Sequence, residues 1–283
     1  MITFKNIGVE SARLGNQMSQ YAAVLGVAYK NKYDFAIPYK NQYVSGKMFN
    51  LDPNVRSWID VNFTVPIGFK LTAPDLHSKD EILIQNNYEE DIAKGFDENV
   101  FNISDNTNIH GYFQCEKYWL HIKDTIKKEF TFKDEFAETA NIKINDIKQK
   151  YQEIVAVHIR RGDYVGNSLR HPLQPISYYQ KAIDMFDDKE YAFIIFSDDI
   201  VWCKEYFGES DSIFYAEKNI DFVDLCMMSL CDHNIMANST FSWWGAWLNF
   251  NPNKKVIAPS NWLGPEIKHL QTNNLYCQNW TVI

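Results

Sequence analysis

The chain has 283 residues, of which 46% are hydrophobic and 15% aromatic, so two domains can each bury an apolar core. Its net charge is −8 and no basic stripe runs along it, which argues against a nucleic-acid-binding protein. No stretch reaches the roughly 18 apolar residues of a membrane span, and the first residues do not resemble a signal peptide. We therefore expect a soluble protein of the cytoplasm, with peripheral attachment at the inner face of the membrane left open.

The five cysteines are scattered along the chain and form neither a CxxC pair nor a zinc-binding spacing. An odd number of cysteines without such spacing is typical of reduced thiols in an intracellular protein. Cys226 and Cys231 lie in or beside an apolar helical pattern, so we expect them in a core.

The chain begins with the pattern of a strand, a glycine-bounded turn and a helix. The strand is predicted over 2–7 and the helix over 16–30, the order that opens a Rossmann-like domain. GxGxxG is missing, so a dinucleotide cofactor is not supported. Gly15 and Asn16 at the helix start can offer backbone N–H groups and an amide to an anion. An ordinary helix cap beside a solvent-facing Arg13 is the alternative.

The rest of the first half is less regular. Strands are predicted over 33–38 and 108–113, and helices over 115–130 and 133–151. Residues 39–108 are poorly periodic, so we expect long loops and short helices there. We place a domain boundary near residue 150.

The second half alternates strongly between strands and helices. Strands are predicted over 154–157, 191–196, 212–215, 233–237 and 255–258. Helices are predicted over 177–186, from 201, over 221–231 and over 243–249. This alternation predicts an α/β fold with a parallel sheet.

The stretch from Glu153 to Tyr164 carries the strongest functional signal. Its apolar run leads directly into two arginines, and three of the five arginines in the chain, Arg160, Arg161 and Arg170, fall within eleven residues. A guanidinium group fits phosphate and carboxylate, and loops at the carboxyl ends of parallel strands bind ligands. We infer a pyrophosphate clamp. A structural ion pair between Asp163 and an arginine remains the alternative.

Polar residues follow three predicted strands of the second half, and parallel strands would bring them together. The three groups are His158 with Arg160 and Arg161, Ser197 with Asp198 and Asp199, and Ser239 with Thr240 and Ser242. Arginines and a helix N-terminus suit a pyrophosphate, while a carboxylate suits a base or ribose. Two alternatives for the adjacent aspartates stay open: a helix N-cap pair, or a site for Mg²⁺ or Mn²⁺.

Six motifs, in order and over nearly the whole chain, resemble the α-1,2-fucosyltransferases of glycosyltransferase family 11. They are ARLGNQMSQYA (12–22), HGYFQCEKYW (110–119), VHIRRGDYV (157–165), FSDD (196–199), NSTFSWWGAWL (238–248) and VIAPSNW (256–262). The small size and missing membrane anchor resemble the bacterial branch of the family, which builds O-antigens and related surface oligosaccharides.

The resemblance implies a GT-B-like fold, in which two Rossmann-like domains with parallel sheets face a cleft. The domain over 1–150 would bind the acceptor, and packing of about the last 20 residues of the chain back on this domain is left open. The domain over 151–283 would bind GDP-fucose as a co-substrate. It further implies inverting transfer of L-fucose to the 2-hydroxyl of a galactose-terminated oligosaccharide or lipid-linked glycan, with neither metal nor cofactor.

The resemblance also implies roles for residues of the matching motifs. Arg160 and Asp163 would act in catalysis. The donor would be bound by Arg13, Asn16, His158, Arg161, Asp198, Asp199, Ser239, Thr240, Phe241 and Ser242. The loop over 167–174 follows the family only loosely, so we expect it to shape acceptor choice through Arg170 and His171, together with Gln114.

The general base is not assigned by the motifs. Asp163 is the candidate in the strongest motif, yet neighbouring arginines would stabilise its carboxylate and weaken it as a base. An orienting role toward Arg160 is the alternative. Two further functions stay open for the chain: a transferase with another nucleotide sugar or linkage, and a sugar-nucleotide-binding protein that has lost catalysis.

Overall fold

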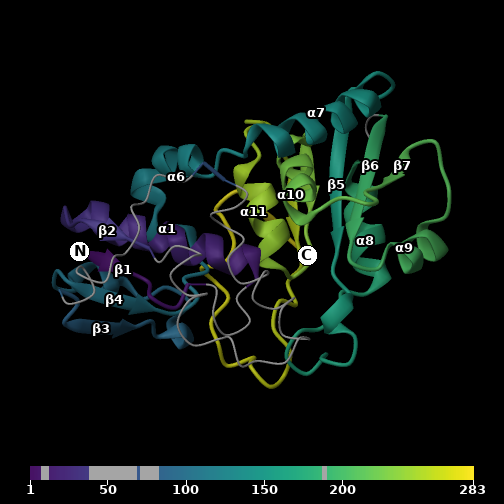
Figure 1. Ribbon diagram of the computed structural model, residues 1–283. Coiled ribbons are helices and arrows are strands. Elements are labelled where there is room, and N and C mark those ends of the chain that lie inside the picture. Colours follow the sequence, from purple (N-terminus) through teal and green to yellow (C-terminus); the bar gives the residue numbers. More distant parts are fainter. Residues whose placement is uncertain (8–12, 38–68, 71–82, 187–189) are drawn as a thin grey trace, which may run out of the picture. The chain divides into compact units, whose positions relative to one another are not determined.

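The computed structural model describes residues 1–7, 13–37, 69–70, 83–186 and 190–283 (Figure 1). The chain divides into two compact units. The first comprises Met1–Thr131 and Gln271–Leu275, and the second Phe132–Leu270 and Tyr276–Ile283. The division thus falls at Thr131, before the position near 150 that we expected from the sequence. Helix α7 (Asp134–Lys148) belongs to the second unit, because its apolar face packs into that unit's core.

The first unit is built on a four-stranded parallel sheet with the strand order β2-β1-β4-β3. Its strands are β1 (Ile2–Thr3), β2 (Phe35–Ala36), β3 (Asn86–Glu89) and β4 (Thr107–His110). Strands β1, β2 and β4 were predicted from the sequence at these places, but the predicted strands are longer than the observed ones. Strand β3 was not predicted, since its sequence, NNYE, is polar and mostly exposed.

Helix α1 (Leu14–Asn31) confirms the helix predicted over 16–30. Nearly every residue from Leu14 to Ala28 is buried, and small residues such as Ala22 and Ala23 let neighbouring chain segments approach the helix closely. A helix that is apolar around its whole circumference is buried on all sides. Lys32, with φ 58°, ends the helix in the left-handed conformation, and its N–H reaches back to the last carbonyls.

The helix predicted over 115–130 is wrong as one continuous element. The structure has two 3₁₀ turns, η4 (Glu116–Tyr118) and η5 (Leu120–Ile122), before the short helix α6 (Lys123–Glu129). Tyr118 and Trp119 are fully buried there, so burial of two large rings prevails over helical periodicity. Of the irregular region expected over 39–108, residues 39–68 and 71–82 lie outside the described residues. The remainder holds β3 and the turns η2 (Ile92–Lys94) and η3 (Glu98–Asn102).

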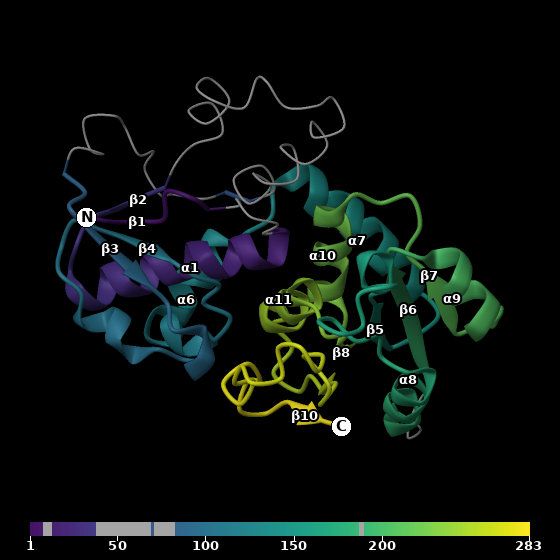
Figure 2. The same ribbon diagram turned by 90° about the horizontal axis from the view of Figure 1, so that it is seen from below.

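The second unit is built on a six-stranded parallel sheet with the order β10-β9-β8-β5-β6-β7 (Figure 2). Its strands are β5 (Glu153–Ile159), β6 (Tyr191–Ser197), β7 (Ile213–Tyr215), β8 (His233–Ile235), β9 (Val256–Ala258) and β10 (Thr281–Val282). All but β10 were predicted. If these six strands are numbered 1 to 6 in chain order, the sheet reads 6-5-4-1-2-3. Read from the opposite edge this is 3-2-1-4-5-6, the Rossmann order. The order changes direction between β5 and β8, and ligands of such sheets bind outside the carboxyl ends of the strands at that place.

Helices cover both faces of this sheet (Figures 1 and 2). Helices α7 and α10 (Asp221–Leu230) share one apolar core with the sheet, and α11 (Thr240–Leu248) packs beside α10. Helices α8 (Ile176–Ile183) and α9 (Ile200–Phe207) share the other core. The 3₁₀ turns η6 (Gly162–Tyr164) and η7 (Asp184–Phe186) complete the regular elements. Residues of β5 alternate between the two cores, which explains its uninterrupted apolar sequence.

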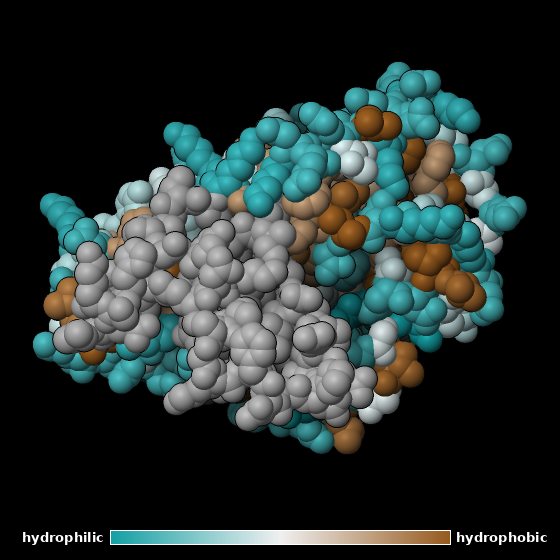
Figure 3. All heavy atoms as spheres, viewed as in Figure 1, coloured by the Kyte–Doolittle hydropathy of each residue, from teal (hydrophilic) through white to brown (hydrophobic). Residues whose placement is uncertain are grey.

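The expected burial of Cys226 and Cys231 is confirmed. Trp243, Trp244 and Trp247 of α11 are buried as well. Hydrophilic residues cover most of the visible face of the second unit, and apolar side chains appear there in separate small groups (Figure 3). Within the described part of the chain, no helix combines the length and apolarity needed to cross a bilayer.

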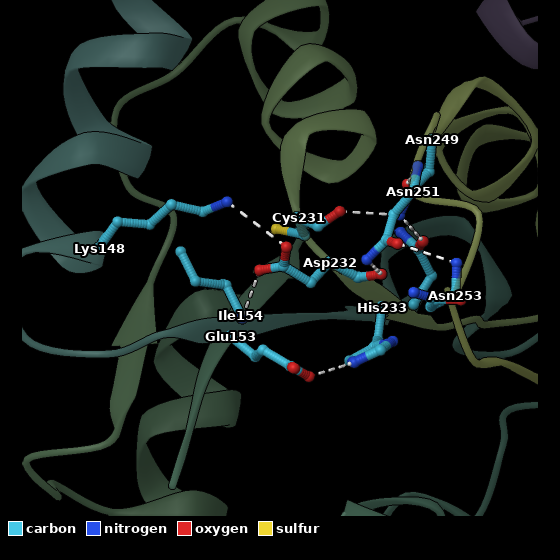
Figure 4. A network of polar contacts seen from close by, with 10 residues as sticks. Lys148, Glu153, Ile154, Cys231, Asp232, His233, Asn249, Asn251 and Asn253 are labelled. Carbon is cyan, nitrogen blue, oxygen red and sulfur yellow. Dashed lines mark hydrogen bonds and ion pairs between the residues drawn. The ribbon is translucent and has the colours of Figure 1, made fainter. Parts of the chain in front are cut away.

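Polar contacts tie together the amino ends of the two central strands (Figure 4). The Asp232 carboxylate accepts the N–H of Ile154 at 2.8 Å, which joins the loop before β8 to β5. The buried His233 bridges β8 to Glu153 through Nε2 at 2.8 Å, while its Nδ1 accepts the N–H of Lys255 at 2.9 Å. These contacts fix the register of β5 and β8, and with it the positions of their carboxyl ends.

Candidate active site

The structure brings the three predicted strand ends together. Strand β5 pairs with β6 so that Ile159 lies opposite Ser197, and β5 pairs with β8 so that Val157 lies opposite Ile235. The residues that come after these strands therefore share one edge of the sheet. This edge spans the place where the strand order changes direction, so the predicted convergence of the three strand ends is confirmed.

Arg160 lies among carboxylates just beyond β5. Its guanidinium group donates to Asp163 at 2.5 Å and to Asp198 at 2.6 Å, and lies over the Tyr164 ring at 5.5 Å from its centroid. The Arg160 side chain is 15% exposed, so it is held in place yet open on one side. The ion pair with Asp163 that we weighed as an alternative is present, and it orients the guanidinium group.

Arg161 is fixed by a different set of contacts. Its Nε donates to Asp199 at 2.9 Å, and its guanidinium plane lies 3.8 Å from the centroid of the Trp202 ring. The hydrogen bond from Arg161 holds the pKa of Asp199 below its usual value. Asp199 also accepts the N–H of Trp202 at 3.2 Å as the N-cap of α9, so the N-cap alternative holds for this residue.

Asp198 shapes the loop that comes after β5. One of its oxygens accepts the N–H groups of Arg161 at 2.9 Å and Gly162 at 3.1 Å, while the other pairs with Arg160. A Cβ atom on Gly162 would lie 2.4 Å from the Asp198 carboxylate. Glycine in the RRGDY motif is therefore explained by the close approach of a carboxylate from the neighbouring strand.

His158 at the end of β5 is buried against the ring of Phe241, with 5.6 Å between ring centroids. Burial lowers its pKa to about 4, so the imidazole is neutral at neutral pH. Its Nδ1, like Oδ1 of Asn238 after β8, is buried without a hydrogen-bond partner among the described residues. Two such atoms at adjacent strand ends suit a site that a polar ligand completes.

The turn between β8 and α11 has the form of a helix N-terminus. Ser239 is the N-cap and accepts the N–H of Phe241 at 3.3 Å. The buried Ser242 hydroxyl is directed at the carbonyl groups of Ala237 and Ser239, so it supports the turn from inside. The positive end of the α11 dipole thus faces the same sheet edge as the arginines.

The loop after η6 carries the predicted acceptor residues of the second unit. The His171 ring stacks on Tyr164, with 5.0 Å between ring centroids and 19° between the ring planes. Tyr164 donates to the carbonyl of Asn238 at 2.9 Å. Arg170 is exposed and faces Glu266 at 4.0 Å.

Three further predicted residues belong to the first unit. Arg13 is exposed at the N-cap of α1, and Asn16 in the first turn accepts a hydrogen bond from Gln114 at 2.8 Å. The sequence did not single out Glu90, although its buried carboxylate accepts the N–H groups of Tyr112 and Phe113 and the hydroxyl of Tyr118.

Glu90 therefore holds the loop after β4 that carries Gln114. Phe113 in this loop has φ 51°, a conformation that needs such support. No sequence signal marks Glu90, because it comes after the polar strand β3 that periodicity misses.

Comparison with known proteins fits this geometry. The model of the family described as glycosyl transferase family 11 matches residues 5–283. The chain belongs to glycosyl transferase family 11. In the second unit, the motifs that resembled this family lie at the strand ends. In the first unit, they lie around α1 and the loop after β4.

The names of two similar proteins give different transferred sugars. The chain is 39% identical over 170 residues to an alpha-1,2-colitosyltransferase of Escherichia coli, covering 55% of this chain and 56% of that protein. It is 28% identical over 262 residues to galactoside alpha-(1,2)-fucosyltransferase 2 of Rattus norvegicus, covering 88% of this chain and 67% of that protein. The chain thus spans about half the length of the bacterial relative.

Solved structures support the fold. The fucosyltransferase NodZ from Bradyrhizobium superimposes with a TM-score of 0.50 and 12% identity, covering 86% of this chain and 91% of NodZ. At this identity the likeness concerns the fold alone. It agrees with the two parallel sheets in assigning a GT-B-like α/β fold to this member of family 11.

Proposed function

We propose that this protein transfers L-fucose from GDP-β-L-fucose to the 2-hydroxyl of a terminal galactoside, with inversion, and so forms an α-1,2 linkage in a surface oligosaccharide such as an O-antigen. The observation that carries the proposal is the match to galactoside alpha-(1,2)-fucosyltransferase 2 over 88% of the chain. The bacterial relatives, which include an O-antigen biosynthesis glycosyltransferase, support the type of product.

The strand-end geometry supports the donor half of the reaction. Arg160 is oriented by two carboxylates and Arg161 by a carboxylate and an indole ring, so both guanidinium groups are preorganised for a diphosphate. The N-terminus of α11 adds backbone N–H groups beside them. Their positive charge would stabilise the phosphate that leaves as the bond to fucose breaks.

We also propose that the transfer needs no metal ion or other cofactor. Each of the four oxygens of Asp198 and Asp199 already accepts a hydrogen bond or ion pair from this loop or from α9. A divalent cation would have to displace those donors. Among the described residues, no group of three or more His, Cys, Asp or Glu side chains has the arrangement of a metal site.

A second donor merits a test, because a relative of 39% identity is named an alpha-1,2-colitosyltransferase. Colitose is L-fucose without its 3-hydroxyl group. A site that hydrogen-bonds this hydroxyl would reject the deoxy sugar by up to about 10⁴-fold, whereas an apolar site would favour it. Comparing kcat/KM for GDP-fucose and GDP-colitose decides between the two donors.

The decisive experiment measures GDP release from GDP-fucose with lactose or N-acetyllactosamine present and EDTA added, and then examines the product by NMR. Acceptor-dependent release and a new α-1,2 linkage in EDTA are the expected result. Arg160→Ala should abolish release, while Lys268→Gln, an exposed cation of the same unit, should leave it unchanged. Turnover that requires Mn²⁺, or turnover of GDP-mannose or UDP-galactose alone, would contradict the proposal.

A further inference from the structure

Transfer to a sugar hydroxyl releases a proton, and most titratable groups near Arg160 are already engaged. Asp163 pairs with Arg160, and the oxygens of Asp198 and Asp199 all accept donors. Burial raises the pKa of Tyr164 to about 12, so its hydroxyl keeps its proton, which it donates to a backbone carbonyl. None of these groups is available as a proton acceptor at neutral pH.

His158 is also unsuited to the role. It is 5% exposed and closed off by Phe241, and its pKa of about 4 makes it a weak base. A sugar hydroxyl that stays near the protein surface would therefore not reach the buried Nδ1 of this ring. A partly exposed group of the same cluster is better placed to meet that hydroxyl.

His171 has the position and the state that this task requires. It is only partly buried, and no hydrogen bond occupies its ring nitrogens among the described residues. Its ring stacks on Tyr164, and the Arg160 guanidinium lies over the same Tyr164 ring. A partly exposed imidazole thus shares an aromatic contact with the group that would bind the leaving phosphate.

The backbone on both sides of His171 is anchored. The N–H of His171 donates to the carbonyl of Asn167 at 2.9 Å, and the carbonyl of Pro172 accepts the side-chain amide of Asn238 at 3.0 Å. The carbonyl of Arg170 accepts the N–H of Gly264 at 2.8 Å. The ring is therefore positioned by the end of β8 and by the C-terminal segment, as a group that meets a substrate must be.

The charges that face His171 come from three directions. Asp163 in η6 favours the imidazolium form, while Arg160 at the end of β5 and Arg170 beside it oppose that form. Glu266 in the C-terminal segment faces Arg170, and Tyr164 beneath the ring keeps its proton. Burial prevails, so the pKa of His171 lies below its ordinary value of 6.5 and the ring is neutral at pH 7.

We propose that His171 is the general base of the transfer, a role that rests on the proposed function. A ring nitrogen accepts the proton of the acceptor hydroxyl as its oxygen forms the bond to the anomeric carbon of fucose. The bond from that carbon to the β-phosphate oxygen breaks, and its electron pair leaves with GDP. Arg160 neutralises the charge that develops on the phosphate, and Asp163 orients Arg160.

Two substitutions separate proton transfer from ring stacking. His171→Gln removes both, whereas His171→Phe keeps a flat ring on Tyr164 but cannot accept a proton. Both should lower kcat at saturating acceptor by about 10²- to 10⁴-fold, with the affinity for GDP unchanged. His269→Gln, an exposed histidine of the same unit, serves as the matched control and should behave as wild type.

The dependence of kcat on pH gives an independent readout. Wild-type kcat should fall as the pH drops through the pKa of His171, below 6.5, because the imidazolium ion cannot accept a proton. This acid limb should be absent in both variants. A limb that persists in His171→Gln, or wild-type kcat in His171→Phe, would overturn the proposal. GDP affinity falling in step with kcat would assign His171 to loop structure and overturn it as well.

Measuring transfer by the wild-type protein in the same assay distinguishes failure of the proposed base from failure of the proposed function. No transfer from GDP-fucose to any β-galactoside by the wild type rejects the proposed function and the base together. Transfer by the wild type with unaffected His171 variants rejects only the base.

Discussion

Replacing Gly162 with alanine tests the close approach of Asp198 without any assumption about function. The added Cβ would lie 2.4 Å from Oδ2 and 3.0 Å from Cγ of Asp198, whereas ordinary contacts begin at 3.4 Å. The Asp198 carboxylate must therefore move away by about 1 Å, the difference between 2.4 Å and the 3.4 Å at which ordinary contacts begin. The φ of Gly162 lies outside the positive range, so alanine is not strained there by the backbone.

The cost of Gly162→Ala depends on the contacts that the displaced carboxylate makes. It accepts two backbone N–H groups at 2.9 and 3.1 Å and pairs with Arg160 at 2.6 Å. A hydrogen bond to a charged group contributes about 1.5–3 kcal/mol, but these groups are partly exposed and water replaces part of the loss. We expect Gly162→Ala to lower the free energy of unfolding by about 1–3 kcal/mol. In the Asp198→Ala background it should be neutral, or stabilising by up to about 1 kcal/mol.

Urea denaturation of the four proteins of this double-mutant cycle measures the coupling. Six of the eight tryptophans lie in the second unit, so tryptophan fluorescence reports mainly on the unit that carries Gly162. A coupling free energy of about 1–4 kcal/mol is expected. Equal effects of Gly162→Ala in both backgrounds, within about 0.5 kcal/mol, would refute the steric explanation.

Further predictions concern charge at the strand ends and in the first unit. Arg160→Lys should lose most of the activity that Arg160→Ala loses, because an ammonium group cannot pair with two partners in a fixed plane; kcat/KM for GDP-fucose measures this. Asp163→Ala should raise the KM for GDP-fucose several-fold by loosening Arg160; unchanged affinity and turnover would leave Asp163 without a role. Because the pKa of His158 is lowered from 6.5 to about 4, the unfolded chain binds the proton first as the pH falls. Stability should thus be complete above pH 6.5 and decline toward pH 4 by about 3 kcal/mol, a decline that His158→Phe should remove in denaturation curves. Glu90→Gln should destabilise the first unit by about 1–3 kcal/mol at pH 7, since an amide accepts at only one of the two positions where Glu90 receives N–H and O–H donors; far-UV circular dichroism during thermal unfolding tests it.

The convergence of the strand ends in the second unit could be predicted from the sequence, because a parallel sheet turns chain order into spatial order. An apolar run such as that after Glu153 forms a strand buried on both faces, and the residues directly after the run must emerge at the carboxyl edge. Once β5, β6 and β8 were recognised as strands, the convergence of Arg160, Asp198 and Ser239 could be inferred from their places in the chain. Helix α1 was predicted differently, from the pattern of a strand, a glycine-bounded turn and a helix at the start of the chain.

Sequence reasoning did not reveal which side chains these arginines and aspartates contact. Neighbouring arginines and aspartates permit several pairings, and only the geometry assigns Arg160 to Asp163 and Asp198 and Arg161 to Asp199 and Trp202. Ser242 resembles a ligand for phosphate in the sequence, but helix geometry turns its hydroxyl toward the preceding turn. Such choices depend on side-chain directions and local burial, which periodicity does not encode.

The segment Gln271–Leu275 has a consequence for dividing this protein into parts. It belongs to the first unit although it lies near the C-terminus, and there its Asn274 accepts a hydrogen bond from Lys117 at 2.5 Å. The polypeptide therefore passes between the units three times, so no single cut separates them. A fragment of residues 1–131 alone would lack this segment, which packs closely against the rest of the unit. The closeness is evident at Gly95, where an added Cβ would meet the carbonyl of Gln271. Chimaeras that exchange the first unit between family members should carry this segment together with the N-terminal block, as a two-piece graft.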